Sequence, residues 1–376
     1  MSIVDKMYFL ALDSNFNVIS VVDDYESVIW TERYTDVGDF EIHGNANTQL
    51  INVMNTASYI LNTATYGVMA IEKPKIGFDE EIGSTATISG RGFESFLDRR
   101  IILANKTILN PADARISQIM CSLVTDAYGS SNPQRYWNKL VVTNDASIST
   151  LDVLESGVAL QFNMGDNLLT LIINLATAYG IGFKCRYNPL TGLMTFSTYE
   201  GIDRTIQGNN QVIFSDSFDN LLTASDESVY KAIKNTILVI GNATDDNGVP
   251  ILPTVVGDSM WQGLNRRETY AKIDQDKIVY LTPTTQRDMT NAEYVSALLL
   301  AGATQLNNSA YQAYKNFEGE ILETESCQYG AHYNLGDMVL FRTQLMTDTP
   351  ARLTEIIFSD DQESGKTVAP SFTYGV

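Results

Sequence analysis

The chain has 376 residues, and its 45 acidic side chains against 25 basic ones give a formal net charge of −20. A chain of this length exceeds one ordinary hydrophobic core, so we expect roughly two to four packed units. The charge argues against a surface built to bind nucleic acid, because such a surface sets Lys and Arg against phosphates.

The cysteines, the N-terminus and the negative charge indicate the surroundings in which the protein is made and acts. Cys121, Cys185 and Cys327 are far apart and lack the spacing of a metal site, so we interpret them as small buried hydrophobes of a protein made in a reducing cytoplasm. The N-terminus carries no secretory signal and the apolar runs are too short for a bilayer, so we expect no stable membrane insertion. The negative charge fits either ordinary solubility or a channel wall along which DNA slides without sticking.

Residues 1–104 are predicted to form a β-rich unit. Tyr8–Leu12 and Val18–Val22 flank the turn-rich segment Asp13–Asn17, which indicates a hairpin. Many short strands with little helix favour a barrel or a sandwich. The further strands are expected at Ser27–Tyr34, Asp39–His43, Ser58–Leu61, Gly67–Glu72 and Thr85–Gly90.

Residues 105–204 are predicted to form an α/β insertion domain. Asn110 and Pro111 have the types found at a helix cap and first helical position, and Gly129 ends that helix. A second helix is expected at about Asp166–Tyr179, with Gly180 as its C-terminal cap. A strand–turn–strand pattern follows at Phe183–Tyr187 and Leu193–Tyr199.

Residues 205–376 are predicted to form a second β domain, and part of 205–240 is expected to complete the first. The longest helix runs from Thr290 to about Lys315, within a peripheral helical segment of about 289–316, and Thr290 with Glu293 forms a capping box. The chain is therefore expected to be α+β and mainly β. The other expected features are strand character at Val229–Ile240, a turn at Thr244–Gly248, a β-rich region at Glu318–Val376 and a hairpin tip at Asp360–Gly365.

The sequence offers few residues for catalysis. His43 and His332 are the only histidines, and neither belongs to a nucleophile elbow, a Cys–His pair or a helical zinc motif. Gly180-Ile181-Gly182 is similar to the start of a dinucleotide fingerprint, but it follows a helix and lacks the third glycine. We therefore predict no catalytic residue, no cofactor and no metal site, and a protein that is not an enzyme.

Two alternatives stay open. A glycan-degrading enzyme needs only a pair of carboxylates, and Glu320, Glu323 and Glu325 lie close together in a predicted strand. A receptor-binding module could recognise a surface polysaccharide through exposed aromatic side chains, for example Trp137 or Trp261.

Five sequence blocks, taken in order, resemble siphophage tail-hub proteins over nearly the whole chain. The same family is similar to the baseplate hub of contractile tails and to the N-terminal hub region of tail-associated lysins. Many relatives continue past the hub, whereas this chain ends at Val376, so we expect a lysin or receptor-binding head on another polypeptide. The blocks are Trp30–Ile42, Ser89–Ile102, Tyr199–Thr205 with Val212–Ser215 and Asn220-Leu221, Leu335–Val339, and Ala351–Ile357.

The resemblance implies two tail-tube-like β domains per chain, so that a homotrimer places six similar units around a channel. Such a ring closes and extends the tail tube and adapts six-fold to three-fold symmetry. Its implied partners are the distal tail protein ring, the tail tube, the tape-measure protein, and receptor-binding proteins or fibres. DNA passes through without specific binding. The implied location is the tail tip of the virion, after synthesis in the host cytoplasm.

Glycine, charged and aromatic residues within these blocks are the candidates for scaffold or interface roles. The same residues have an ordinary interpretation as turn glycines and surface ion pairs. The candidate scaffold or interface residues are Trp30, Arg33, Gly38, Asp39, Arg91, Arg99, Arg100, Asp203, Arg204, Gly336, Asp337, Arg352 and Glu355.

Overall fold

The computed structural model describes most of the chain, and its secondary structure confirms the predicted α+β, mainly β class. Among the described strands the largest assembly is one open 13-stranded sheet, and no closed barrel is formed. The described residues are 7–80, 83–109, 115–144, 159–208, 210–229, 233–257, 260–274, 277–282, 285–306, 314–322, 324, 327–342, 348–361 and 365–374.

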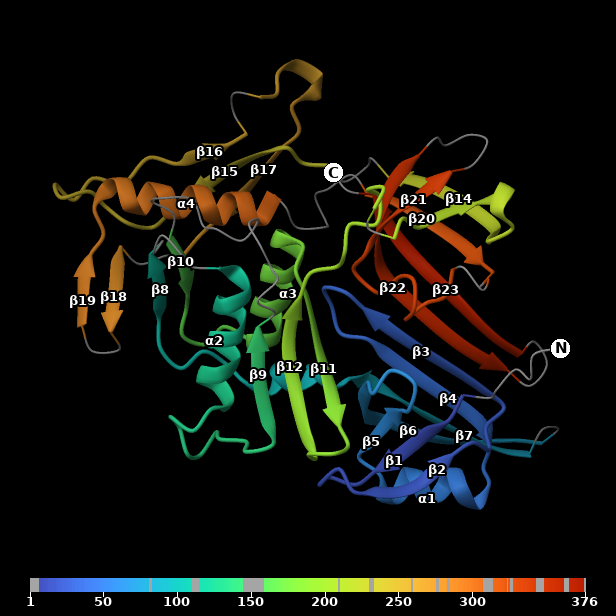
Figure 1. The fold of residues 1–376 in the computed structure, drawn as a ribbon. Coiled ribbons are helices and arrows are strands. Elements are labelled where there is room, and N and C mark those ends of the chain that lie inside the picture. The colour runs from blue at the N-terminus through green and yellow to red at the C-terminus, as the bar shows by residue number, and fades with distance from the viewer. Residues whose placement is uncertain are drawn as a thin grey trace.

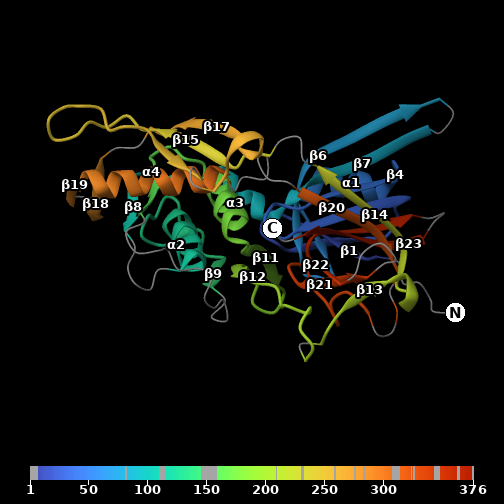
Figure 2. The ribbon, with the colours of Figure 1, turned by 90° about the horizontal axis from the view of Figure 1, so that it is seen from above.

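The first β unit contains every strand expected in residues 1–104. The predicted hairpin around Asp13–Asn17 is present, because the strands on either side pair in antiparallel register. The last two strands of the unit form a hairpin that extends as an arm beyond its neighbours (Figure 2). The strands are β1 (Phe9–Leu12), β2 (Val18–Val22), β3 (Ser27–Arg33), β4 (Asp39–Asn45), β5 (Tyr59–Asn62), β6 (Val68–Asp79) and β7 (Gly83–Gly92).

Helix α1 (Thr48–Thr56) is absent from the sequence prediction. Its N-cap is Asn47, whose side chain accepts a hydrogen bond from the backbone N–H of Leu50 at 2.8 Å. The segment is rich in Thr, Asn, Ile and Val, which are weak helix formers. Burial of Leu50 and Val53 in the β core therefore stabilises a helix that local propensity does not indicate.

The second β unit joins the first in a single sheet. Strand β22 pairs with β3 in antiparallel register from Glu355 opposite Arg33 to Asp361 opposite Ser27. The two units therefore lie edge to edge, as Figure 1 shows for the blue and red strands. The strands of the second unit are β13 (Ile213–Ser215), β14 (Leu221–Val229), β20 (Tyr314–Ile321), β21 (Met338–Arg342), β22 (Thr349–Asp361) and β23 (Gly365–Tyr374).

One boundary prediction in this region is wrong. Tyr314 and Lys315 begin strand β20 and do not end a helix, since they pair with Val229 and Ser228 of β14. The pairing partner is distant in sequence, so a local pattern could not fix the boundary. The strand character expected at Val229–Ile240 is present at Val229, the last residue of β14, and at Thr236–Ile240, while residues 233–235 are not in a strand.

The insertion has two helices packed on a small sheet. Helix α3 ends where expected, with Gly180 in the left-handed conformation at φ +65°, which glycine adopts without steric cost. The predicted cap at Asn110 and Pro111 lies outside the described residues, and Gly129 follows the end of α2 as expected. The elements are β8 (Lys106–Leu109), α2 (Ile116–Tyr128), β9 (Leu140–Asn144), β10 (Ala159–Phe162), α3 (Leu168–Tyr179), β11 (Gly182–Asn188) and β12 (Leu193–Tyr199), preceded by the 3₁₀ helix η1 (Phe93–Arg99).

A third, outer unit lies next to the insertion (Figure 1). Its longest helix begins with the predicted capping box, because Thr290 Oγ1 accepts from the N–H of Glu293 at 3.2 Å and the Glu293 carboxylate accepts from the N–H of Thr290 at 2.9 Å. The predicted turn at Thr244–Gly248 is confirmed by the Gly248 N–H, which donates to Asp245 O at 3.0 Å. The elements are β15 (Thr236–Ile240), β16 (Thr254–Val256), β17 (Glu268–Lys272), β18 (Ile278–Thr282), β19 (Thr285–Asp288) and α4 (Asn291–Leu306).

Among the residues that the structure describes, buried apolar side chains form three clusters. The first runs through both β units, from Trp30 and Phe40 to Ile356 and Phe372, so the two units share one core. The second fills the insertion and continues into the first β unit at Leu12, Phe16 and Leu61, and the third lies under α4. The domain boundaries expected at residues 104 and 204 stay predictions. In the described part of the chain, no helix combines the length and apolar character needed to cross a membrane.

Candidate functional site

The end of β3 is the place where three parts of the chain meet. Tyr34, directly after β3, donates its backbone N–H to Thr354 O of β22 at 2.9 Å, and its hydroxyl donates to Gly180 O at the end of α3 at 2.9 Å. Its ring is buried between Gly182 and Gly336. A Cβ on either glycine would lie 2.2 Å or 2.4 Å from the ring, so this approach requires glycine. Tyr34 therefore ties both β units to the insertion.

Arg352 on β22 contacts both Gly336 and the ring of Tyr34. Its Nη1 donates to Gly336 O at 2.8 Å, and its guanidinium carbon lies 5.4 Å from the centre of the Tyr34 ring. Burial raises the pKa of Tyr34, and the positive charge of Arg352 opposes that shift. Tyr34 is thus a neutral packing and hydrogen-bonding residue near neutral pH.

A buried ion pair fixes the connection between the insertion and the second β unit. Arg204 Nε lies 2.5 Å from Asp337 Oδ2, and the two side chains are only 8% and 3% exposed. The Asp337 carboxylate also accepts from the N–H groups of Ile202 at 2.7 Å and Asn334 at 2.9 Å. Asp203 accepts from the N–H of Thr205 at 2.9 Å and so shapes the turn beside the pair. Both carboxylate oxygens of Asp337 therefore accept hydrogen bonds, as a buried carboxylate requires.

A second charged group bridges the two β units. Arg33 on β3 lies 2.6 Å from Glu355 on β22 and 2.5 Å from Asp39 on β4. Arg33 also donates to Val37 O at 2.8 Å, which holds the turn before β4. Only glycine fits at position 38 in that turn, because a Cβ on Gly38 would lie 2.1 Å from Thr31 O. These side chains are part-exposed, so the pair contributes less than a buried one.

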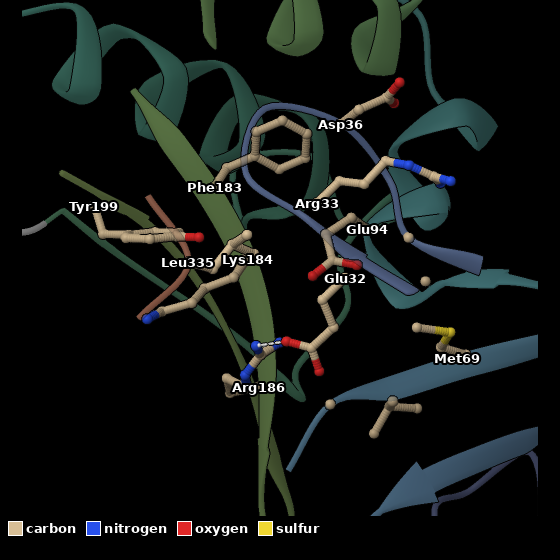
Figure 3. Close-up of a pocket in the computed structure, with 14 residues that line it drawn as sticks. Glu32, Arg33, Asp36, Met69, Glu94, Phe183, Lys184, Arg186, Tyr199 and Leu335 are labelled. Atoms are coloured by element: carbon tan, nitrogen blue, oxygen red, sulfur yellow. Dashed lines mark hydrogen bonds and ion pairs between the residues drawn. The ribbon is translucent and has the colours of Figure 1, made fainter. Parts of the chain in front are cut away.

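Two carboxylates and one guanidinium meet where the insertion contacts the first β unit (Figure 3). Arg186 on β11 lies 2.6 Å from Glu32 on β3, and Glu32 also accepts from Trp30 Nε1 at 3.2 Å. Glu94 accepts from the N–H of Cys185 at 2.6 Å. Burial raises the pKa of the Glu94 carboxyl, while the charge of Arg186 opposes that rise.

The cavity beside these acids is too small for catalysis on a glycan. Its volume is about 20 Å³, which holds roughly one water molecule. Small-molecule sites typically have volumes of about 300–1,000 Å³. The Glu32 and Glu94 pair is therefore a packing feature and not a sugar-cleaving pair.

The remaining candidates lie on more exposed surface. Arg91 on β7 pairs with Glu72 at 2.9 Å and with Asp98 at 3.4 Å. Arg99 and Arg100 lie at the end of η1, where Arg100 covers the ring of Tyr128 at 4.7 Å. The structure thus brings together most of the predicted residues at the junction of β3, β22 and the insertion, and it leaves Arg91, Arg99 and Arg100 outside that junction.

The two histidines each lie within hydrogen-bonding distance of a neighbouring group. His43 lies 3.0 Å from Thr87 Oγ1, and His332 Nδ1 accepts from the N–H of Gln328 at 3.0 Å within a turn. The backbone of Glu320 lies in β20, and Glu323 and Glu325 lie outside the described residues. No three His, Cys, Asp or Glu side chains are placed to hold a metal within the described ranges.

The two tryptophans proposed for glycan recognition differ in exposure. Trp137 is not the exposed platform expected, because it packs 5.7 Å from Phe93 and 6.0 Å from Phe16, centre to centre. Trp261 is 39% exposed in the outer unit. That unit also carries an open groove of about 380 Å³ over β15 and β17, lined by Leu238, Val255, Arg266, Glu268 and Tyr270 among others.

Four residues at the junction are absent from the predicted scaffold or interface candidates: Glu32, Tyr34, Glu94 and Arg186. A charged residue inside an apolar strand, such as Glu32 beside Trp30, indicates a buried partner. The identity of that partner, 154 positions away in sequence, has no local signal.

The chain matches one protein-family model over nearly its whole length. The family model described as Siphovirus ReqiPepy6 Gp37-like protein matches residues 9–372. No curated protein matches the chain. The tail protein from Neisseria meningitidis MC58 is 11% identical with a TM-score of 0.57, and the match covers 98% of this chain and 97% of that one.

Two further solved structures are similar. The 43 kDa tail protein of prophage MuSo2 from Shewanella oneidensis is 14% identical with a TM-score of 0.52, covering 98% of this chain and 97% of that one. A chain of the half-lidded Francisella PdpA-VgrG complex is 9% identical with a TM-score of 0.50, covering 98% of this chain and 57% of that one. At these low sequence identities, the likeness shows only that the folds are similar.

Proposed function

Because the chain belongs to the Siphovirus ReqiPepy6 Gp37-like protein family, we propose that it is a structural, non-enzymatic hub protein of a phage tail tip. Three copies form a homotrimeric ring that closes and extends the tail tube. The ring adapts the six-fold tube to three-fold symmetry and is the path by which DNA leaves the tail.

The observation that carries this proposal is the pairing of β3 with β22. It sets two β units side by side in one sheet, over seven residue pairs from Arg33 opposite Glu355 to Ser27 opposite Asp361. The shared hydrophobic core and the Arg33–Glu355 ion pair hold the two units together. A rigid chain with two such units is what a three-fold ring needs in order to present six β units.

The similar fold of the Neisseria and Shewanella proteins, both titled tail proteins, supports a place in the tail. We propose the distal tail protein ring, the tail tube and the tape-measure protein as neighbours, with receptor-binding proteins or fibres attached outside. The net charge of −20 supports a channel that DNA crosses without specific binding, because like charges repel.

Sedimentation velocity of the purified chain tests the proposal. The expected species has three times the 41.6 kDa mass of one chain, and it persists at low concentration. A monomer at every concentration, together with absence of the chain from purified tails, would sink the proposal.

One observation favours a second role in host attachment. The open groove over β15 and β17 carries Tyr270, 66% exposed, beside the ion pair of Arg266 and Glu268 at 2.5 Å. An aromatic face with polar neighbours is suited to stacking on a sugar ring. Binding of the purified chain to host cells that is abolished by Tyr270→Ala would support this role. Equal binding by the wild type and the Tyr270→Ala variant would exclude the groove as the binding site.

A further inference from the structure

Three arginines lie around the ring of Tyr128, where the end of η1 meets the segment after α2. Arg100 follows η1 directly, and its guanidinium carbon lies 4.7 Å from the centre of that ring, while its Nη1 donates to Arg99 O at 3.2 Å. Arg135 donates from Nη2 to Ile101 O at 3.0 Å, which joins the segment after α2 to the segment after η1. Burial raises the pKa of Tyr128 to about 12, and the positive charges of Arg100, Arg99 and Arg135 all oppose that rise. Three positive charges therefore lie close to one ring.

None of the carboxylates that the structure describes forms an ion pair with these three arginines. Two acidic residues lie near them in the chain or across a backbone hydrogen bond. Asp98 pairs instead with Arg91 at 3.4 Å. The backbone carbonyl of Asp166 accepts from the N–H of Ile102 at 2.9 Å, but its carboxylate accepts from the N–H of Asn163 at 2.7 Å. We call Arg99, Arg100 and Arg135 the arginine cluster.

The members of the arginine cluster repel one another. Burial lowers the pKa of the Arg135 guanidinium, and the positive charge of Arg100 lowers it further. The Nε atom of Arg100 is buried and has no hydrogen-bond partner among the described residues. The cluster therefore holds more positive charge than the described residues around it offset, and an anion bound across the guanidinium groups would relieve the repulsion.

We propose that the arginine cluster binds a phosphate group, either as free phosphate or as a phosphate monoester. The planar fork of a guanidinium matches the paired oxygens of a phosphate, and one phosphate has enough oxygens to accept from more than one arginine. A phosphate monoester carries a charge of about −1.5 to −2 near neutral pH, so it offsets more of the positive charge than a single carboxylate does. The bound group bridges the end of η1 and the segment after α2. This site goes beyond the proposed hub function and does not depend on the trimer.

The compact form of the arginine cluster favours a single phosphate over DNA. A protein that binds duplex DNA sets many Lys and Arg side chains against a row of phosphates. Here the three arginines surround one ring, in a chain with a net charge of −20 that repels a long polyanion. Ile101, directly after Arg100, is 48% exposed, so an apolar side chain lies beside the cluster, where it can contact the organic part of a monoester.

Isothermal titration calorimetry of the full-length chain with inorganic phosphate and with glycerol phosphate tests the site. We expect saturable binding of at least one of the two with a Kd below about 1 mM, and binding of acetate that is weaker by about tenfold or more at equal ionic strength. Arg99→Gln and Arg135→Gln should each weaken that binding by about tenfold or more, because each removes a charged donor and keeps a polar side chain. Arg342→Gln is the matched control and leaves binding unchanged, since Arg342 already pairs with Asp348 at 2.6 Å. Tighter binding of glycerol phosphate assigns the site to a monoester, and tighter binding of inorganic phosphate assigns it to the free ion.

Three results would overturn the phosphate site. The first is that neither inorganic phosphate nor glycerol phosphate saturates the wild type by about 1 mM, and the second is equal binding by the wild type and the Gln variants. The third is binding of duplex DNA that the Gln variants lose while neither phosphate compound binds, which assigns the cluster to nucleic acid. Arg99 and Arg135 lie on different segments, so a folding defect in one variant, detected by circular dichroism, leaves the other to decide. A wild-type monomer in sedimentation velocity contradicts the hub proposal and leaves the phosphate site standing.

Discussion

The Arg204–Asp337 pair provides the sharpest test of how the junction is held. Asp337→Ala leaves the Arg204 guanidinium, 8% exposed, without its carboxylate and removes the acceptor of the Ile202 and Asn334 N–H groups. Removing one partner of a buried pair typically costs about 3–5 kcal/mol. We expect the free energy of unfolding to fall by about that amount. Urea unfolding followed by tryptophan fluorescence measures it, since Trp30 is fully buried in the shared core.

Two further variants complete the test. Glu72→Ala removes a carboxylate that is 30% exposed and pairs with Arg91, so the free energy of unfolding changes by only about 0–1 kcal/mol. The double change Arg204→Met with Asp337→Leu recovers most of the stability lost in Asp337→Ala, because no buried charge is left unpaired. A loss below about 1 kcal/mol for Asp337→Ala, equal to that of Glu72→Ala, would refute the reasoning.

Three other predictions concern single residues. Gly336→Ala should lower the free energy of unfolding by more than about 1 kcal/mol in the same assay, because φ is +95° and a Cβ would lie 2.4 Å from the Tyr34 ring; an unchanged midpoint would contradict this. Burial raises the pKa of Glu94 above its ordinary 4.5, so the wild type loses stability as pH rises through the raised value. The stability of Glu94→Gln relative to wild type should therefore increase from about pH 4.5 upward, and a pH-independent difference would rule this out. Thr290→Ala should lower the protection of the first α4 amides against hydrogen exchange by about 1 kcal/mol, whereas equal protection would exclude a capping role.

Local chemistry explains what the sequence predicts well. The Gly180 cap, the Thr290–Glu293 box and the hairpin before β2 depend on residues a few positions apart, and each is present. Helix α1 and the start of β20 depend on distant partners. Leu50 stabilises a helix by packing on strands, and Tyr314 pairs with Val229. Tertiary contacts of this kind override local propensity.

The junction shows the same division. The turn glycine Gly38 can be read from the sequence, and Arg33 and Glu355 both occur in blocks that resemble tail-hub proteins. Their contact spans 322 positions, and the Glu32–Arg186 contact spans 154. Charged residues that pair at such separation leave no periodic pattern, so their partners follow only from the folded chain.

Electron cryo-microscopy of the purified oligomer tests the central claim most directly. The account predicts a three-fold ring in which six β units surround a channel, with the insertion and the α4 unit outside it. A particle with one β unit per chain at the channel, or with no three-fold axis, would contradict the account.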